Sequence, residues 1–130
     1  MPAWVLVLSQ DSLSSSGLEQ SVRMAGFSPR RAPDLARTEV LLRQGEDPAA
    51  AVVDLVSAGE DGMAVLESLS GRTALIAIAL DPASDLSLRA TRWGAEVVAP
   101  GEIRAALPPL LSRVVKDEAN RTETGQNETT

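Results

Sequence analysis

Short apolar segments that alternate with helix-like segments constrain the fold of this chain more than any other feature. Trp4–Leu8 is wholly apolar, Ala50–Asp54 ends on an acid, and Ala74–Leu80 is the most apolar run. Runs of this kind are typical of strands that are buried on both faces of a parallel sheet. Phe27 and Glu96–Ala99 mark two weaker strands. Five strands that alternate with helices predict a parallel sheet with helices on both faces and right-handed crossovers.

Capping residues and glycines set the expected bounds of the helices between these strands. A loop is expected over Leu55–Gly62, which contains two glycines. Pro108 and Pro109 interrupt the apolar period of the last helix, so a kink or a break is expected there. The expected helices run from Asp11 or Ser12 to Gly26, from Pro33 to Gly45, and over Met63–Leu69, Ser84–Trp93 and Glu102–Val115.

The composition excludes several classes of function. The chain carries 12 Lys and Arg against 18 Asp and Glu, a net charge of -6, so it lacks the basic surface that nucleic-acid binding requires. It has no cysteine and no histidine, which excludes disulfides, thiolate or imidazole metal sites and Ser-His-Asp triads. No apolar run is long enough to span a bilayer, and the N-terminus lacks the basic region of a signal peptide. We therefore expect a cytoplasmic protein without nucleic-acid or membrane contacts.

The last residues differ in composition from the rest of the chain. From Lys116 onward the sequence holds one alanine and no other apolar residue, so it cannot bury a core. We expect one folded domain over residues 1–115 and a disordered polar tail or linker over residues 116–130.

Three segments resemble the receiver domains of two-component response regulators. Asp54-Leu-Val-Ser-Ala-Gly-Glu-Asp61-Gly62 is similar to the segment in which the phosphoacceptor aspartate ends the third strand. Leu88-Arg-Ala-Thr-Arg-Trp-Gly94-Ala95 resembles the fourth helix and its Gly-Ala end, and Ala99-Pro100 stands where receivers carry Lys-Pro. The resemblance implies a flavodoxin-like α/β sandwich of three layers with sheet order 2-1-3-4-5. It also implies a bacterial-type signalling protein, with Asp54 at the position of the phosphoacceptor.

The departures from the receiver pattern lie in the phosphorylation site. Receivers have two acids after the first strand, which hold Mg²⁺ together with the phosphoacceptor; here Ser9 and Gln10 are neutral, and Asp11 comes one place later. The hydroxyl that follows the fourth strand is replaced by Ala79, and the lysine before the proline by Ala99. Mg²⁺ prefers charged oxygen ligands, so this pocket is degenerate and we expect neither a metal nor a cofactor in it.

Two interpretations of Asp54 remain open. It is either a working phosphoacceptor or a vestigial one, kept because its carboxylate accepts hydrogen bonds from backbone N–H groups of the next loop. A displaced metal site of Asp54, Asp61 and Asp11 is a further hypothesis, although Asp61 is better explained as a cap of the third helix.

The fourth helix supplies the candidate interaction face. Arg89, Arg92 and Trp93 lie on or next to it, and Arg89 has the i,i+4 spacing to pair with Asp85. Trp93 either fills core space or stands out as an interface anchor. Receivers commonly dimerise through the fourth helix, fifth strand and fifth helix, so the resemblance makes this face a candidate for homodimers.

We expect a signalling module that binds proteins without being phosphorylated and that is not an enzyme. One alternative is a weakly active response regulator that is phosphorylated on Asp54. The other is a small-ligand binder that uses the space left at Ser9, Gln10, Asp11, Ala79 and Ala99.

Overall fold

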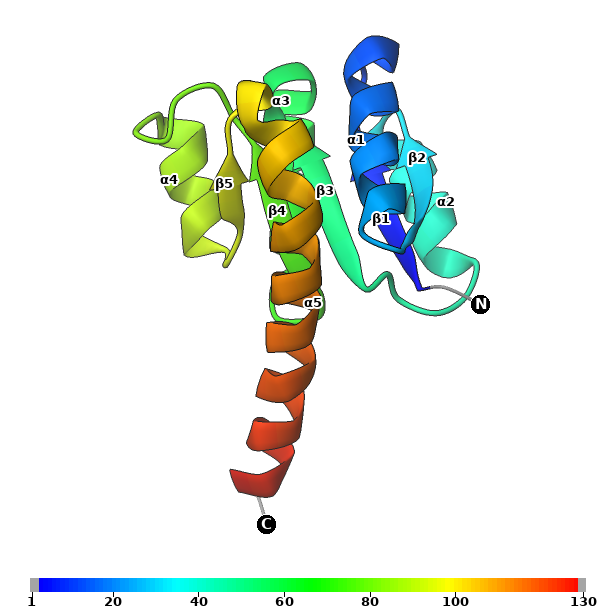
Figure 1. The fold of residues 1–130 in the computed structure, drawn as a ribbon, viewed down its shortest axis with the longest axis vertical. Helices are drawn as coiled ribbons and strands as arrows, with labels where there is room; N and C mark the ends of the chain where they lie inside the picture. The colour runs from blue at the N-terminus through cyan, green and yellow to red at the C-terminus, as the bar shows by residue number, and fades with distance from the viewer. Residues whose placement is uncertain (1–2, 129–130) are drawn as a thin grey trace.

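The computed structural model describes the backbone of residues 3–128 and the side chains of residues 3–120. Five parallel strands form one sheet in the order β2-β1-β3-β4-β5, which confirms the predicted fold class and strand order (Figure 1). The strands are β1 (Trp4–Leu8), β2 (Ser28–Ala32), β3 (Ala50–Asp54), β4 (Ala74–Ile78) and β5 (Glu96–Val98). The helices are α1 (Ser12–Met24), α2 (Leu35–Arg43), α3 (Leu55–Leu69), α4 (Asp85–Arg92), the short 3₁₀ helix η1 (Pro100–Glu102) and α5 (Ile103–Glu128).

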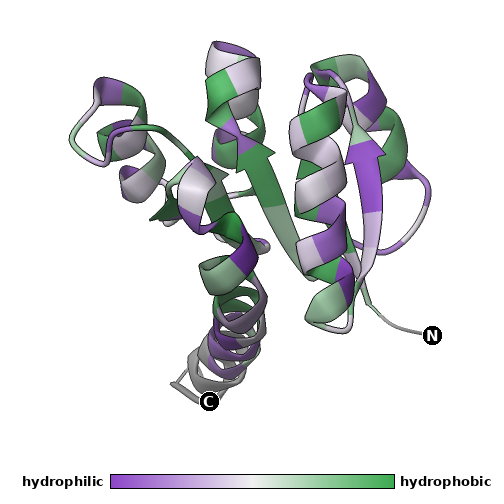
Figure 2. Ribbon diagram, turned by 45° about the horizontal axis from the view of Figure 1, so that its top comes forward, coloured by the Kyte–Doolittle hydropathy of each residue, from purple (hydrophilic) through white to green (hydrophobic). Residues whose placement is uncertain are grey.

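Helices cover both faces of the sheet, as the sequence predicts. Alternate residues of β1 point to opposite faces: Leu6 and Leu8 pack with α2, α3 and α4, while Val5 and Val7 pack with α1 and α5. Strands β1, β3 and β4 are buried throughout, and Figure 2 shows them as the apolar centre of the molecule. The two apolar layers explain why these strands read as nearly continuous apolar runs.

Helix α3 begins directly after β3, so the loop expected over Leu55–Gly62 is wrong. Gly59 has φ 52° and ψ -124°, outside the helical region, and it divides α3 into a short first part and a longer second part. A glycine adopts this backbone conformation without the steric penalty of a side chain. The two glycines of this segment indicate an irregular backbone correctly, but the irregularity is confined to Gly59 and does not extend over a loop.

Helix α5 spans both prolines as one helix, so the break expected at Pro108 and Pro109 is absent. Leu107 and Leu111 lie on either side of the prolines and are fully buried. Burying two leucines contributes about 3–6 kcal/mol, which is comparable with the roughly 6 kcal/mol that two prolines cost inside a helix. Packing against the sheet therefore decides the conformation here.

The same helix continues to Glu128, and the polar tail predicted from Lys116 onward begins within it. Extending an existing helix adds a hydrogen bond for each residue fixed and avoids the cost of nucleation, and residues 116–120 include good helix formers. The backbone of α5 projects past the edge of the sheet (Figure 1). Residues 129–130, the end of the predicted tail, lie outside the described residues.

Candidate functional site

The carboxyl ends of the five strands meet at one edge of the sheet, where the following helices begin. Aspartates cap three of these helices: Asp11 caps α1, Asp34 caps α2 and Asp54 caps α3, while Ser84 caps α4. A side-chain oxygen at this position satisfies one of the free N–H groups of the first turn. The acids at this edge are therefore engaged with the helices that they start.

Asp54 is held by three hydrogen bonds and is only 3% exposed. Its Oδ2 accepts a hydrogen bond from the hydroxyl of Ser9 at 3.0 Å and another from the hydroxyl of Ser57 at 3.0 Å. Its Oδ1 accepts from the backbone N–H of Val56 at 3.1 Å. The backbone N–H of Gln10 donates to Ser57 Oγ at 3.0 Å. The segment after β1 and the first turn of α3 are thus joined through the carboxylate and two serines.

The sequence predicts that the Asp54 carboxylate accepts from a backbone N–H of the next segment, and Val56 supplies this N–H. Ser57 was not singled out by sequence analysis. The signal that could have found it is its place three residues after a capping aspartate, within the first helical turn, where a hydroxyl can reach the cap. Ser57 falls within the loop expected over Leu55–Gly62, so the sequence alone does not predict this contact.

Asp11 lies at the same edge, where it caps α1. Its carboxylate accepts from the Ser14 hydroxyl at 2.8 Å and from the Leu13 N–H at 3.1 Å. The hydrogen bond from Ser14 is the main reason that the pKa of Asp11 is lowered, followed by that from Leu13. The Gln10 side chain is exposed, so the network at Asp54 uses its backbone N–H.

The displaced metal site of Asp54, Asp61 and Asp11 is not assembled. Asp61 lies inside α3 and is exposed, so its predicted role as a helix cap is also wrong; Asp54 caps α3 instead. Within the described part of the chain, no group of three or more acidic side chains is placed to hold a metal ion.

Arg31 is a cation at this edge that sequence analysis missed. It is the fourth residue of β2 and donates from Nη2 to the carbonyl oxygen of Ser9 at 3.2 Å. Its Nε is buried and has no hydrogen-bond partner among the described residues. The two consecutive arginines at the edge strand gave no signal that one of them reaches the end of β1.

The part of the edge above β4 is apolar. Ala79 is buried and Ala99 is half-buried. Both are alanines, so their side chains offer neither a hydroxyl nor an ammonium group. Beside Ala79 lies an open recess of about 280 Å³ between the segments after β3 and β4. The recess is lined by Leu55, Val56, Ala79, Leu80, Asp81, Ser84 and Leu86.

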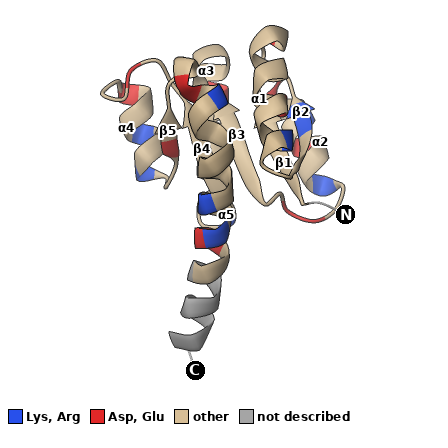
Figure 3. Ribbon diagram, in the orientation of Figure 1, with Lys and Arg blue, Asp and Glu red and all other residues tan. Residues whose placement is uncertain are grey.

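Arg89 is tied to α3. Its guanidinium binds both carboxylate oxygens of Glu60, at 2.7 and 3.0 Å, and lies 3.6 Å from Asp85, which confirms the predicted i,i+4 pair. The hydrogen bond with Glu60 raises the pKa of Arg89 and lowers that of Glu60. Figure 3 shows the basic segments of α4 and the acidic segment that precedes it.

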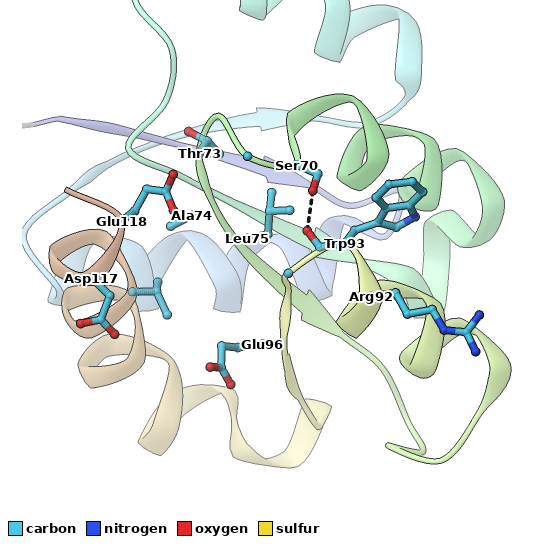
Figure 4. A pocket seen from close by; sticks show the side chains of 12 residues that line it. Ser70, Thr73, Ala74, Leu75, Arg92, Trp93, Glu96, Asp117 and Glu118 are labelled. Atoms are coloured by element: carbon cyan, nitrogen blue, oxygen red, sulfur yellow. Dashed lines mark hydrogen bonds between the residues drawn. The ribbon is translucent and has the colours of Figure 1, made fainter. Parts of the chain in front are cut away.

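Trp93 is 37% exposed and follows the end of α4, so it does not fill the core. Its carbonyl oxygen accepts from the Ser70 hydroxyl at 2.7 Å, which joins the ends of α3 and α4. Figure 4 shows the cavity of about 450 Å³ beneath this bond. Asp117 and Glu118 of α5 line one side, and the Arg92 side chain on the other side points away from them.

Solved structures of response regulators have the same arrangement of strands and helices. NtrX from Brucella abortus superimposes with a TM-score of 0.81 at 17% identity, over 97% of this chain and 29% of that chain. A response regulator from Thermotoga maritima gives 0.75 at 15% identity, over 89% of this chain and 99% of that one. The signal receiver domain of a DNA-binding response regulator from Colwellia psychrerythraea gives 0.73 at 18% identity, over 88% and 98%.

The chain has the receiver-domain fold of response regulators. Comparison of its sequence with protein-family models gives no match, and neither does comparison with curated protein sequences. The likeness therefore lies in the arrangement of the backbone, and it confirms the fold that the resemblance implied. In the described residues of this receiver fold, no helix combines the length and the apolar character needed to cross a membrane.

Proposed function

We propose that this receiver fold is a signalling module that binds protein partners without being phosphorylated. The observation that carries the proposal is the state of Asp54. Its carboxylate is buried, caps α3 and accepts two serine hydroxyls. Phosphorylation of an oxygen in this network requires breaking the hydrogen bonds that join β1 to α3.

The charges around Asp54 support the same proposal. A transferring phosphoryl group needs metal ions or fixed cations to offset its developing negative charge. Ser9 and Gln10 supply no carboxylate for Mg²⁺, and Asp11 is engaged with Ser14 and Leu13. Ala99 supplies no cation, and Arg31, the cation at this edge, donates to the carbonyl oxygen of Ser9. A weakly active response regulator remains the alternative that the experiments below are designed to detect.

The contact surface that we propose lies at the end of α4, around Arg92 and Trp93. Both side chains are exposed, and exposed tryptophan and arginine are the residue types that most often dominate protein interfaces. Arg89, which the sequence placed in the same face, is better explained as a link between α4 and α3. The partners that we propose are proteins of a bacterial signalling pathway in the cytoplasm, or a second copy bound through α4, β5 and α5.

The experiment compares the two sites in cells of the source organism. We expect Asp54→Asn to retain signalling, because asparagine also caps helices well. We expect Arg92→Glu to impair it, because charge reversal at an interface creates like-charge contacts that cost several kcal/mol. Arg23→Glu, at an exposed position on α1, is the matched control and should have no effect.

Loss of signalling in Asp54→Asn, with Arg92→Glu unaffected, contradicts the proposal. Circular dichroism of each purified variant is needed beside the cell assay, so that a folding defect is recognised. A folded but inactive Asp54→Asn protein would identify the chain as a phosphorylated response regulator.

A further inference from the structure

The recess above β4 exposes apolar side chains at an edge where the helix caps are polar. Leu80 is 73% exposed and Val56 is 51% exposed, and both line the recess. Leu55, Ala79 and Leu86 contribute the rest of its apolar wall. Exposed leucine and valine side chains contribute little to the stability of the fold, so their grouping around one recess points to a contact.

The polar groups of the recess are already used inside the chain. Ser84 accepts from the N–H of Ser87 at 3.2 Å, as the cap of α4. Asp81 accepts from the N–H of Ala83 at 2.9 Å through Oδ1. Sites for small ligands place several convergent polar groups to orient the ligand, and such a set is not found here. The recess is better suited to an apolar side chain that is positioned by the rest of a peptide.

The negative charge of Asp81 at the rim of the recess favours a partner with a positively charged side chain. Asp81 is exposed and is the charged residue among those that line the recess. The nearby acids Glu60 and Asp85 both contact Arg89, so their charge is offset within the chain. The negative charge of Asp81 can therefore attract a cation of a partner. Its Oδ1 accepts a hydrogen bond from the N–H of Ala83.

We propose that this recess is a second contact surface, which takes a bulky aliphatic side chain of a partner protein next to a lysine or arginine that pairs with Asp81. The recess lies at the carboxyl edge, whereas Arg92 and Trp93 lie at the far end of α4. Two separate surfaces allow the module to hold two proteins together. This inference goes beyond the proposed function, and its test does not depend on Asp54 or on Arg92.

The test uses short synthetic peptides and NMR spectra of the isotope-labelled protein. The first peptide carries a leucine beside a lysine, the second replaces this leucine by serine, and the third replaces the lysine by glutamate. We expect saturable shifts at the Val56 and Leu80 amides with the first peptide, in the range of roughly millimolar Kd that a single anchor provides. The second and third peptides should bind at least several-fold more weakly.

Variants of the protein locate the contact. Leu80→Ser should weaken binding of the first peptide by about tenfold, because a leucine contact is lost. Asp81→Asn keeps the acceptor for Ala83 and should remove the preference for lysine over glutamate. Met24→Ser is the matched control, because Met24 is also an exposed apolar side chain, at 62%. It is the last residue of α1 and lies at the end of that helix away from the carboxyl edge. This variant should bind the peptide as the unaltered protein does.

Several outcomes overturn the proposal. Unsaturable shifts, equal binding of the serine peptide, or shifts centred on Trp93 would each do so while leaving the proposed function intact. If free leucine amide binds as tightly as the peptide, the recess is a small-ligand site. If the protein self-associates in light scattering and Leu80→Ser abolishes this, the occupant is a second copy of the chain. Because Leu80 is exposed, its replacement should not disturb folding.

Discussion

The carboxyl edge of the sheet is closed and polar over β1 and β3, whereas it is open and apolar over β4. In the closed part, Ser9, Ser57 and the Val56 N–H satisfy the Asp54 carboxylate. In the open part, Ala79 lies beside a recess and offers no hydrogen bond from its side chain. The closed part uses its polar groups internally, whereas the open part offers apolar side chains and the exposed carboxylate of Asp81.

The structure of the carboxyl edge can be explained by the strands and helix caps alone. The strands and caps that build the edge are those that the fold requires, and they do not depend on a metal or a phosphoryl group. A carboxylate at the end of β3 has a structural use as the cap of α3. Retention of an aspartate at this position is therefore poor support for phosphorylation, because the helix alone explains it.

The largest effect that we predict concerns the closed part, which depends on the close approach of α3 to β3. A Cβ atom at Gly62 would lie 2.8 Å from Val53 Cγ1 and 3.0 Å from Leu55 Cδ2. Gly62→Ala should therefore lower the free energy of unfolding by about 1–3 kcal/mol, the usual cost of overpacking. Denaturant unfolding followed by circular dichroism measures this.

Gly17→Ala is the matched control for this prediction. Gly17 lies in α1, and nothing lies within 4 Å of the position of its Cβ atom. Alanine there should raise the free energy of unfolding by roughly 0.5–1 kcal/mol. Equal effects of the two substitutions would show that α3 does not pack as closely as described.

The next effect contrasts the two parts of the edge directly. Asp54→Ala removes the cap of α3 and leaves buried polar groups without a partner, so the free energy of unfolding should fall by about 1–2 kcal/mol. Asp54→Asn should lose less, because its amide oxygen can still cap the helix. Ala79→Ser should lose less stability than Asp54→Ala, because Ala79 makes no side-chain hydrogen bond and lies beside an open recess. Thermal or denaturant unfolding of the three variants ranks them, and a larger loss at Ala79 than at Asp54 would reverse the comparison.

The smallest effect concerns pH. The hydrogen bond from Arg89 lowers the pKa of Glu60 below its ordinary value of 4.5. A carboxyl with a lower pKa in the folded state adds stability above its unfolded pKa, and this stability is lost as the pH falls through the folded pKa. Glu60→Gln should therefore lower stability slightly at neutral pH and reduce the loss of stability in acid below pH 4.5.

The effect at Glu60 should be small and should fade at high salt, because both side chains of the pair are exposed to solvent. The measurement is denaturant unfolding of the variant and the unaltered protein across the acid range. An acid dependence that Glu60→Gln leaves unchanged contradicts the assignment of the pair.

Strands β1, β3 and β4 could be predicted from sequence because apolar burial on both faces leaves a strong local pattern. The limits of α1 and α4 followed from caps that act within a few residues, such as Asp11 and Ser84. Helix α5 could not be predicted in the same way. Its path through Pro108 and Pro109 depends on how Leu107 and Leu111 pack against strands that are distant in the sequence.

The candidate site was predictable by position but not by contact. The resemblance to receiver domains places Asp54, Ser9 and Ala79 at one edge of the predicted sheet. The hydrogen bond between Ser57 and Asp54 requires α3 to begin at Leu55. The two glycines of this segment favour a loop instead, so the sequence does not predict the bond. The exposure of Trp93 depended on the position of α4 relative to α3, which the bonds of Ser70 and Arg89 fix and which no local pattern encodes.

The central claim is that the edge at Asp54 does not take up a phosphoryl group. The most direct measurement is a titration with Mg²⁺ and beryllofluoride, a phosphoryl mimic, followed by NMR of the Asp54, Val56 and Ser57 amides. We expect no saturable shift of these signals up to millimolar Mg²⁺, because Ser9 and Gln10 supply no carboxylate ligand for the metal. Saturable shifts that centre on Asp54 and disappear in Asp54→Asn would contradict it.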